Sequence, residues 1–314
     1  MDVTSLWHAI ALGVIEGLTE FLPVSSTGHL VLAAKLLGFE EAGPAFKIVI
    51  QVGAILAVVV VYWSKLWGIA LRLPRDRAAQ KFTLNILLAF IPALVIGATL
   101  YKKVQAMLDD PWIVCAALIA GGIVIILVDR MGETARIKEV ESIPPAHAFG
   151  IGFGQVLAMI PGTSRSGATI ITALLLGVDR RTAAEFSFIL AIPTMLAATV
   201  YSLYKEWSQL DFQGLWLIAI GTVVAFLVAL VVVRAVLALI GRIGWAPFGQ
   251  KAAIGDAEHL GWPLRQIVHG LLDGEGLALA HPVAEQISRV AGVAELAGMG
   301  AGIGQGDDRM RIGD

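Results

Sequence analysis

Two polar segments inside apolar sequence constrain this chain more than any other feature. The first runs Glu16-Gly-Leu-Thr-Glu20-Phe-Leu-Pro-Val-Ser-Ser-Thr-Gly-His29, within an apolar stretch over residues 5–38. The second runs from Gln155 to Gly167, within an apolar stretch over residues 146–177. Ionisable groups at membrane depth are costly and are therefore read first as functional. Any fold must bury both segments in protein or let them line a water-filled cavity.

The composition places the chain among membrane proteins that cross the bilayer several times. Of its 314 residues 57% are hydrophobic and 15% are charged, and the mean hydropathy is +0.78. A soluble domain would carry about 25% charged residues. No basic surface is evident that would suggest nucleic acid as a partner. A spanning helix needs about 20 apolar residues, and the sequence predicts full spans near 46–66, 82–101, 112–129, 183–204 and 213–240.

The stretches 5–38 and 146–177 do not read as ordinary spans, because Pro, Gly and polar residues break each one in its middle. Each half has about a dozen residues, which is too short to cross the hydrocarbon core. Two such halves can enter the membrane, turn and leave on the same side. We therefore predict two re-entrant helical hairpins.

The two hairpins also look like copies of one another. A shift of 139 positions brings Ser25 onto Ser164. The same shift brings Gly28 onto Gly167. Chance likeness between apolar segments is the alternative, but these matches fall inside the polar breaks.

The repeat predicts an all-α polytopic membrane protein built from two inverted-topology repeats. Unit one, 1–140, has three spans after its hairpin, and this odd number inverts unit two, 141–248. The hairpins would then enter from opposite faces and meet near the midplane, where a ligand site is expected. Residues 249–314 read as an atypical polar tail without a run long enough to span.

Basic residues are concentrated in the loops on one side of the predicted topology, including Lys65, Arg72 and Arg181. By the positive-inside tendency that side is cytoplasmic. The first hairpin would then enter from the opposite, outer side.

The first hairpin carries two carboxylates that are close in sequence. Glu16 and Glu20 are four positions apart and share a helix face. Two carboxylates in a low-dielectric site need a shared proton, a divalent cation or an arginine between them. Idle residues facing a wet vestibule are the alternative.

Hydroxyl groups and an imidazole follow directly. Ser26 and His29 are three positions apart, a spacing that suits a nucleophile beside a base. Ser25 and Thr27 are candidate ligands for substrate, or caps of the outgoing half-helix. A histidine that only forms a core hydrogen bond is the plainer reading of His29.

The second hairpin offers an anion-binding segment. Backbone N–H groups at a helix start attract anions, and Arg165 adds a planar fork that suits phosphate. These residues could hold a phosphate for phosphoryl transfer, or they could bind an anion that the protein transports. In phosphoryl transfer, positioning and charge stabilisation supply most of the catalysis. The candidate substrate-binding residues here are Gly162, Thr163, Ser164, Ser166, Gly167 and Thr169.

Both polar segments resemble the undecaprenyl-diphosphate phosphatase family, whose members are also known as bacitracin-resistance proteins. The segment Pro161-Gly-Thr-Ser-Arg-Ser-Gly-Ala-Thr169 is similar to that family, as are the first polar segment, Ile50-Gln-Val-Gly53 and Ala184-Glu-Phe-Ser-Phe188. The resemblance implies hydrolysis of a C55 polyprenyl diphosphate to the monophosphate carrier of peptidoglycan synthesis. It implies a multi-pass protein of the bacterial inner membrane, with its active site facing the periplasm, and it leaves a homodimer open.

The resemblance also implies roles for single residues. Ser26 would be the nucleophile with His29 beside it, and Arg165 would clamp the diphosphate. Glu16 and Glu20 would bind a divalent cation, Mg²⁺ or Ca²⁺, or assist catalysis. A transporter or flippase of an anionic polyprenyl lipid is the alternative, because inverted repeats with broken helices are also transporter architecture.

The resemblance ends after Trp245-Ala-Pro-Phe-Gly249, where the family would continue into one more span. Residues 250–314 stand in its place. This departure leaves all the motif residues intact.

Overall fold

The computed structural model describes residues 3–38, 43–108, 111–130, 135–206, 215–245 and 247–248. All of them belong to one compact unit, Met1–Asp256. The predicted tail, 249–314, lies outside the described residues.

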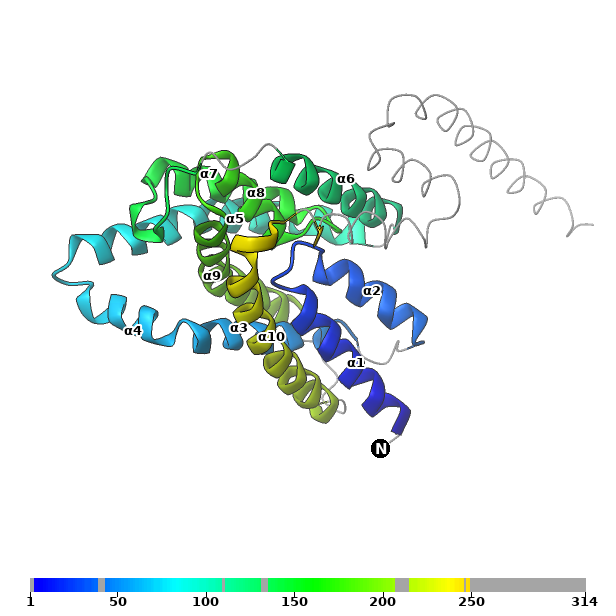
Figure 1. The fold of residues 1–314 in the computed structure, drawn as a ribbon. Coiled ribbons are helices and arrows are strands. Elements are labelled where there is room, and N and C mark those ends of the chain that lie inside the picture. Colours follow the sequence, from blue (N-terminus) through cyan, green and yellow to red (C-terminus); the bar gives the residue numbers. More distant parts are fainter. Residues whose placement is uncertain are drawn as a thin grey trace, which may run out of the picture. The chain divides into compact units, whose positions relative to one another are not determined.

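Helices build this unit (Figure 1). Four of the helices in the described ranges are long and apolar enough to cross a membrane, and a bent pair raises the number to five. The prediction of an all-α polytopic membrane protein is therefore confirmed. The helices are α1 (Val3–Thr19), α2 (Ser26–Leu36), α3 (Gly43–Val61), α4 (Trp63–Arg72), α5 (Arg77–Leu108), α6 (Pro111–Arg130), η1 (Val140–Ser142), α7 (Pro145–Val156), η2 (Leu157–Met159), α8 (Arg165–Leu175), α9 (Arg180–Glu206) and α10 (Leu215–Ile243).

Each broken apolar stretch folds as two short helices joined by an irregular segment. α1 and α2 occupy the first stretch and pack together, and α7 and α8 do the same in the second. None of the four has more than 17 residues, so each is shorter than a full span. Re-entry into a bilayer and the inversion of the repeats stay predictions.

Each hairpin packs on a long helix from the other half of the chain. α1 lies along α10, and α7 lies along α5. Glycines allow the close approach, because a Cβ at Gly13 would meet the carbonyl oxygen of Gly221 at 2.6 Å. A Cβ at Gly152 would meet the carbonyl oxygen of Ala89 at 2.5 Å. Small residues at helix contacts are typical of membrane bundles, where packing rather than apolar burial drives association.

The helix expected to run through 46–66 differs from the prediction. α3 ends at Val61, and α4 departs from it by 68° after Tyr62. Sharp bends usually come from Pro, Gly or an inserted side chain, and neither Pro nor Gly stands at position 62. The sequence therefore carries no local signal for this bend.

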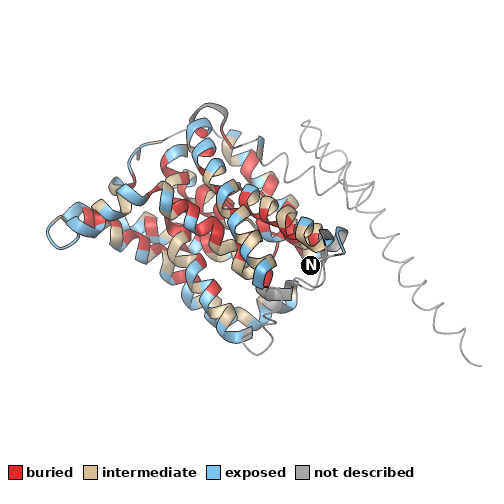
Figure 2. Ribbon diagram, turned by 90° about the horizontal axis from the view of Figure 1, so that it is seen from below, coloured by how far each residue is buried: buried red, intermediate tan, exposed pale blue. Residues whose placement is uncertain are grey.

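Buried residues gather where the helices face one another (Figure 2). They include aromatic side chains and, unusually, carboxylates and hydroxyls. Phe186 and Phe188 of α9 are fully buried. Glu16, Glu20 and Ser26 are also buried, with 0%, 7% and 8% of their surface exposed. Because buried polar groups need partners, these residues define the place to look for a site.

Candidate active site

The tip of the first hairpin turns at a residue with unusual backbone geometry. Ser25 has φ of 61°, in the left-handed region that L-residues seldom adopt. This turn lets α2 begin at the next residue, Ser26. The Ser25 hydroxyl accepts a long hydrogen bond from the Gly28 N–H at 3.5 Å, as an N-cap does.

The tip of the second hairpin is built in a similar way. Gly162 has φ of +93°, and a Cβ there would collide with the carbonyl oxygen of Val114 on α6. Ser164 then caps α8 by accepting a hydrogen bond from the Gly167 N–H at 3.1 Å. Ser164 and Gly167 are the residues that the 139-position shift aligns with the corresponding pair in the first hairpin.

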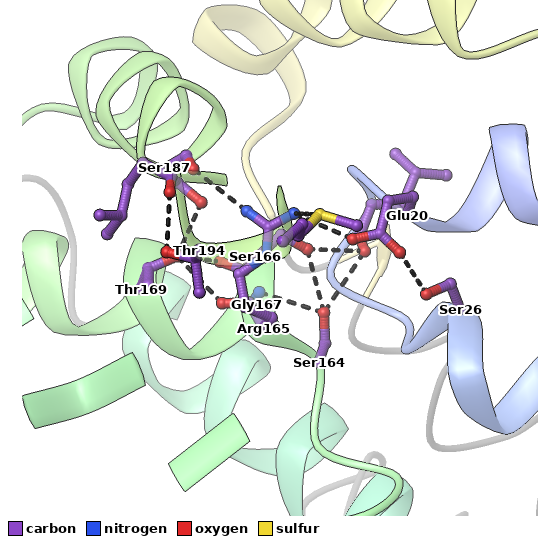
Figure 3. Close-up of polar contacts among 12 residues, drawn as sticks. Glu20, Ser26, Ser164, Arg165, Ser166, Gly167, Thr169, Ser187 and Thr194 are labelled. Carbon is purple, nitrogen blue, oxygen red and sulfur yellow. Dashed lines mark hydrogen bonds and ion pairs between the residues drawn. The ribbon is translucent and has the colours of Figure 1, made fainter. Parts of the chain in front are cut away.

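Glu20 joins the two tips (Figure 3). One carboxylate oxygen, Oε2, accepts a hydrogen bond from the Ser26 hydroxyl at 2.5 Å. The other, Oε1, lies 2.9 Å from Nη2 of Arg165. A hydroxyl, a carboxylate and a guanidinium are thus connected in one line, with the carboxylate in the middle.

Arg165 is held on several sides. Its Nη1 donates to the carbonyl oxygen of Ser187 at 3.1 Å, and its guanidinium lies 5.9 Å from the ring centroid of Phe21. Its Nη2 also lies 3.2 Å from the sulfur of Met195. Its side chain is 14% exposed, and its Nε has no partner among the described residues. The fork is therefore positioned in advance and keeps a free donor.

The other hydroxyls of the second hairpin bind protein groups. Ser164 and Ser166 both donate to the carbonyl oxygen of Leu22 in the first hairpin, at 3.4 and 3.0 Å. Thr169 and Ser187 share a hydrogen bond of 2.7 Å, and Ser166 and Thr169 are buried. These predicted substrate-binding residues thus fasten the second hairpin to the first hairpin and to α9.

The predicted pairing of Ser26 with His29 does not occur in this structure. The Nδ1 atom of His29 lies 2.8 Å from the carbonyl oxygen of Ser25. The acceptor next to the Ser26 hydroxyl is Glu20 instead. Glu20 is therefore the base that the geometry offers to this hydroxyl.

A cavity of about 690 Å³ opens at these groups. At one end it is lined by Glu20, Ser26 and Arg165, and by the predicted residues Ser25, Thr27, Thr163 and Ser164. Its walls come mainly from apolar residues of α5 and α9, including Phe90, Leu94, Ala98, Ala197 and Val200. Tyr101 and Tyr201, also in the lining, form an edge-to-face pair with ring centroids 5.1 Å apart. The cavity therefore suits a ligand with a charged head and an apolar tail.

Glu16 lies behind this cavity rather than in its lining. Its side chain is fully buried, and neither carboxylate oxygen has a hydrogen-bond partner within the described residues. Its carboxyl interacts electrostatically with Glu20 and Arg165. In the described part of the chain, no group of three or more Asp, Glu, His or Cys side chains lies close enough together to hold a metal ion. Two carboxylates nevertheless fit a hard divalent cation, because Mg²⁺ is commonly held by one or two carboxylates together with substrate phosphates.

The sequence alone predicts no role for Ser187, Gln51, Gln155 and Thr194. Ser187 bonds both Arg165 and Thr169. Gln51, Gln155 and Thr194 line the cavity, and Thr194 donates to Oε1 of Gln155 at 3.3 Å. A signal was present for two of them, because Ser187 lies in the 184–188 stretch and Gln51 in the 50–53 stretch that carry the family resemblance.

Comparison with known proteins identifies the family of the chain. A family model described as bacitracin resistance protein BacA matches residues 9–253. This chain belongs to that family.

Curated relatives cover most of the same region. Undecaprenyl-diphosphatase 2 of Paramagnetospirillum magneticum is 55% identical over 242 residues, which cover 77% of this chain and 92% of that protein. Undecaprenyl-diphosphatase of Sphingopyxis alaskensis is 57% identical over 241 residues, with 76% and 91% covered. Undecaprenyl-diphosphatase 1 of Agrobacterium fabrum is 51% identical over 249 residues, with 79% and 93% covered.

Proposed function

We propose that this member of the BacA family hydrolyses undecaprenyl diphosphate to undecaprenyl phosphate and inorganic phosphate. This reaction recycles the lipid carrier of peptidoglycan synthesis and confers bacitracin resistance. The observation that carries the proposal is the line of contacts from Ser26 through Glu20 to Arg165, at the polar end of a cavity with apolar walls. The printed names of the curated relatives support the same reaction.

The diphosphate would lie at the end of the cavity near Arg165, and the first prenyl units would lie between α5 and α9. In the resting enzyme Glu20 and Arg165 neutralise one another. A phosphate that binds Arg165 replaces Glu20 as its partner. Glu20 is then left with the Ser26 hydroxyl and is ready to accept a proton.

The chemical step follows from these contacts. The Ser26 oxygen attacks the terminal phosphorus while the hydroxyl proton passes to Glu20. The bond from that phosphorus to the bridging oxygen breaks, and its electron pair stays on undecaprenyl phosphate. Water then hydrolyses the phosphoserine. Arg165 stabilises the charge on the transferring group, the kind of contact that contributes most in a preorganised site.

Direct attack by water is the variant of this mechanism. Glu20 would then take the proton from water, and the Ser26 hydroxyl would orient the carboxylate. The two versions differ in one observable, because only the covalent version forms a phosphoenzyme.

A divalent cation, Mg²⁺ or Ca²⁺, is part of the proposal. Glu16 and Glu20 would hold it, and it would supply positive charge beside the phosphate oxygens. Thermal unfolding with and without the ion tests this directly. Mg²⁺ or Ca²⁺ should raise the unfolding temperature of the wild type and fail to raise that of Glu16→Gln. An equal rise in both proteins would remove Glu16 from the cation site.

The membrane that holds the protein and the side to which the cavity opens are also part of the proposal. We place the protein in the bacterial inner membrane with the cavity opening to the periplasm, because the basic loops lie on the opposite side. The family resemblance leaves a homodimer open.

The proposed reaction is tested with purified protein in detergent. Undecaprenyl diphosphate should yield undecaprenyl phosphate and inorganic phosphate in equal amounts. EDTA should stop the reaction, and added Mg²⁺ or Ca²⁺ should restore it. Absence of phosphate release from folded protein would refute the proposal. Movement of the intact lipid across vesicle membranes would then favour the transporter alternative.

A further inference from the structure

The helix α4 leaves the direction of its neighbour at the end of a span. α3 has 19 residues, or about 28 Å at 1.5 Å per residue, which nearly equals the hydrocarbon thickness of about 30 Å. α3 can therefore cross most of this thickness by itself. α4 turns away by 68°, so where α3 runs close to the bilayer normal, α4 runs more nearly along the membrane surface than across it. Figure 1 shows α4 and the start of α5 extending away from the other helices.

The face of α4 that contacts the protein lies in a charged layer. Lys65 forms ion pairs of 2.8 Å with Glu141 on η1 and with Glu185 on α9. Ile69, one turn further along this face, is buried. Charged groups are costly in the hydrocarbon core, so this ion-pair network indicates that α4 lies at the level of the lipid headgroups.

A second face of α4 is apolar and uncovered in the described unit. Trp63, Trp67 and Leu71 are 57%, 56% and 66% exposed. They are four positions apart and share one side of the helix. The two indole rings stack with centroids 5.9 Å apart and an angle of 7°. Tryptophan is enriched at the membrane interface, where its ring spans apolar and polar surroundings.

A third face is small and polar. Ser64, Gly68 and Arg72 follow one position after the exposed apolar residues and so lie about 100° further around the helix. The three faces, toward protein, lipid and water, are what a helix in the plane of the interface requires.

The turn after α4 is strongly basic. Four basic residues and one acidic residue lie between positions 72 and 81. Arg72, Arg75 and Arg77 are exposed. The acidic residue, Asp76, pairs with Arg72 at 3.4 Å and leaves the other cations without a carboxylate in the turn. Such clusters attract anionic headgroups at a membrane surface.

We propose that α4 and the turn that follows it form a binding site for anionic phospholipid of the bilayer. Trp63, Trp67 and Leu71 contact the lipid at the boundary of headgroups and acyl chains. Arg75 and Arg77 bind the headgroup phosphate. This site is separate from the cavity at the hairpin tips and does not depend on the proposed hydrolysis.

Lipid binding is measured by native mass spectrometry of the full chain. The protein is mixed in detergent with phosphatidylglycerol or phosphatidylcholine, and bound lipid is counted after release from the detergent. The test variant is Arg75→Gln/Arg77→Gln. The matched control, Lys102→Gln/Lys103→Gln, removes the same charge from exposed positions at the far end of α5. The test variant should bind phosphatidylglycerol about tenfold more weakly than the wild type, since each basic residue near a membrane surface adds to the attraction.

The control variant should bind phosphatidylglycerol like the wild type. Equal weakening in both variants, or equal binding of phosphatidylcholine and phosphatidylglycerol by the wild type, would overturn the proposal. All the substitutions in the test and control variants replace exposed side chains, so loss of folding should not obscure the result.

A depth measurement gives a second test that does not use affinity. A spin label is attached at Trp67→Cys in a Cys115→Ala background, and its accessibility to oxygen and to a water-soluble relaxant is compared in vesicles. The proposal expects a label at the boundary of headgroups and acyl chains. A label at the bilayer centre or fully in water would contradict it.

Discussion

Replacing Arg165 with glutamine should nearly abolish hydrolysis without unfolding the protein. Arg165 provides the only cation among the described residues that line the cavity, and contacts from α9 fix its fork in place. Loss of one preorganised donor to a transition-state oxyanion typically lowers the rate by about 10²–10³-fold. Here a full positive charge is lost as well, so kcat/KM should fall by about 10³-fold, or ~4 kcal/mol.

The assay is phosphate release from undecaprenyl diphosphate, with kcat and KM measured separately. Arg165→Lys should fall between the wild type and Arg165→Gln, because lysine keeps the charge but loses the planar fork. Arg180→Gln is the matched control. Arg180 pairs with Asp129 at 2.9 Å, the same distance as in the Arg165 pair, but it does not line the cavity.

The control should keep kcat/KM within about threefold of the wild type, since its charge does not reach the substrate. If Arg165→Gln retained more than a tenth of wild-type activity, the phosphate clamp would be refuted. Equal losses in Arg165→Gln and Arg180→Gln would assign the effect to general destabilisation.

Three further predictions concern the reaction, the packing and the pH dependence. Acid quenching with terminally labelled substrate should trap labelled protein in the wild type and none in Ser26→Ala, and absence of label in both would favour direct attack by water. Gly17→Val should lower stability by about 1–3 kcal/mol, because a Cβ at Gly17 lies 2.7 Å from a backbone oxygen of α10; Gly68→Ala, with nothing within 4 Å, should be neutral in the same melts. Partial burial acts to raise the pKa of Glu141, but the hydrogen bond and charge of Lys65 lower it below its ordinary value of 4.5. Its stabilising effect is therefore present at neutral pH and is lost as the pH falls through the lowered pKa. The Lys65–Glu141 pair should contribute less than ~1 kcal/mol to the free energy of unfolding at pH 7, so Glu141→Gln should slightly reduce the difference in melting temperature between pH 7 and pH 3.5.

The sequence predicted the helices and the polar breaks well, because both depend on local composition. Apolar runs of about 20 residues have few alternatives in a membrane. Clustered Pro, Gly and Ser mark the breaks at the hairpin tips, whereas single prolines lie inside α5 and α9. The bend after Tyr62 was not predictable in this way. Lys65, three residues after the bend, pairs with Glu141 and Glu185, which are far away in the sequence.

The sequence predicted which polar residues lie at the hairpin tips, but not which atoms they contact. The spacing of Ser26 and His29 places them on one helix face, but it does not say where the imidazole turns. Its Nδ1 lies next to the backbone of Ser25, and Glu20 takes the place beside the Ser26 hydroxyl. Ser187 comes from a helix that joins the site only in the folded chain, so sequence spacing could not assign its role.

The most direct test of the central claim compares two carboxylate substitutions in the phosphate-release assay. Glu20 and Glu185 each form an ion pair, at 2.9 and 2.8 Å, but Glu20 lines the cavity and Glu185 does not. Glu20→Gln should release phosphate at least about 10²-fold more slowly than the wild type, while Glu185→Gln should stay within a few-fold of it. Near-normal hydrolysis by folded Glu20→Gln would contradict the claim that the meeting hairpin tips form the hydrolytic site.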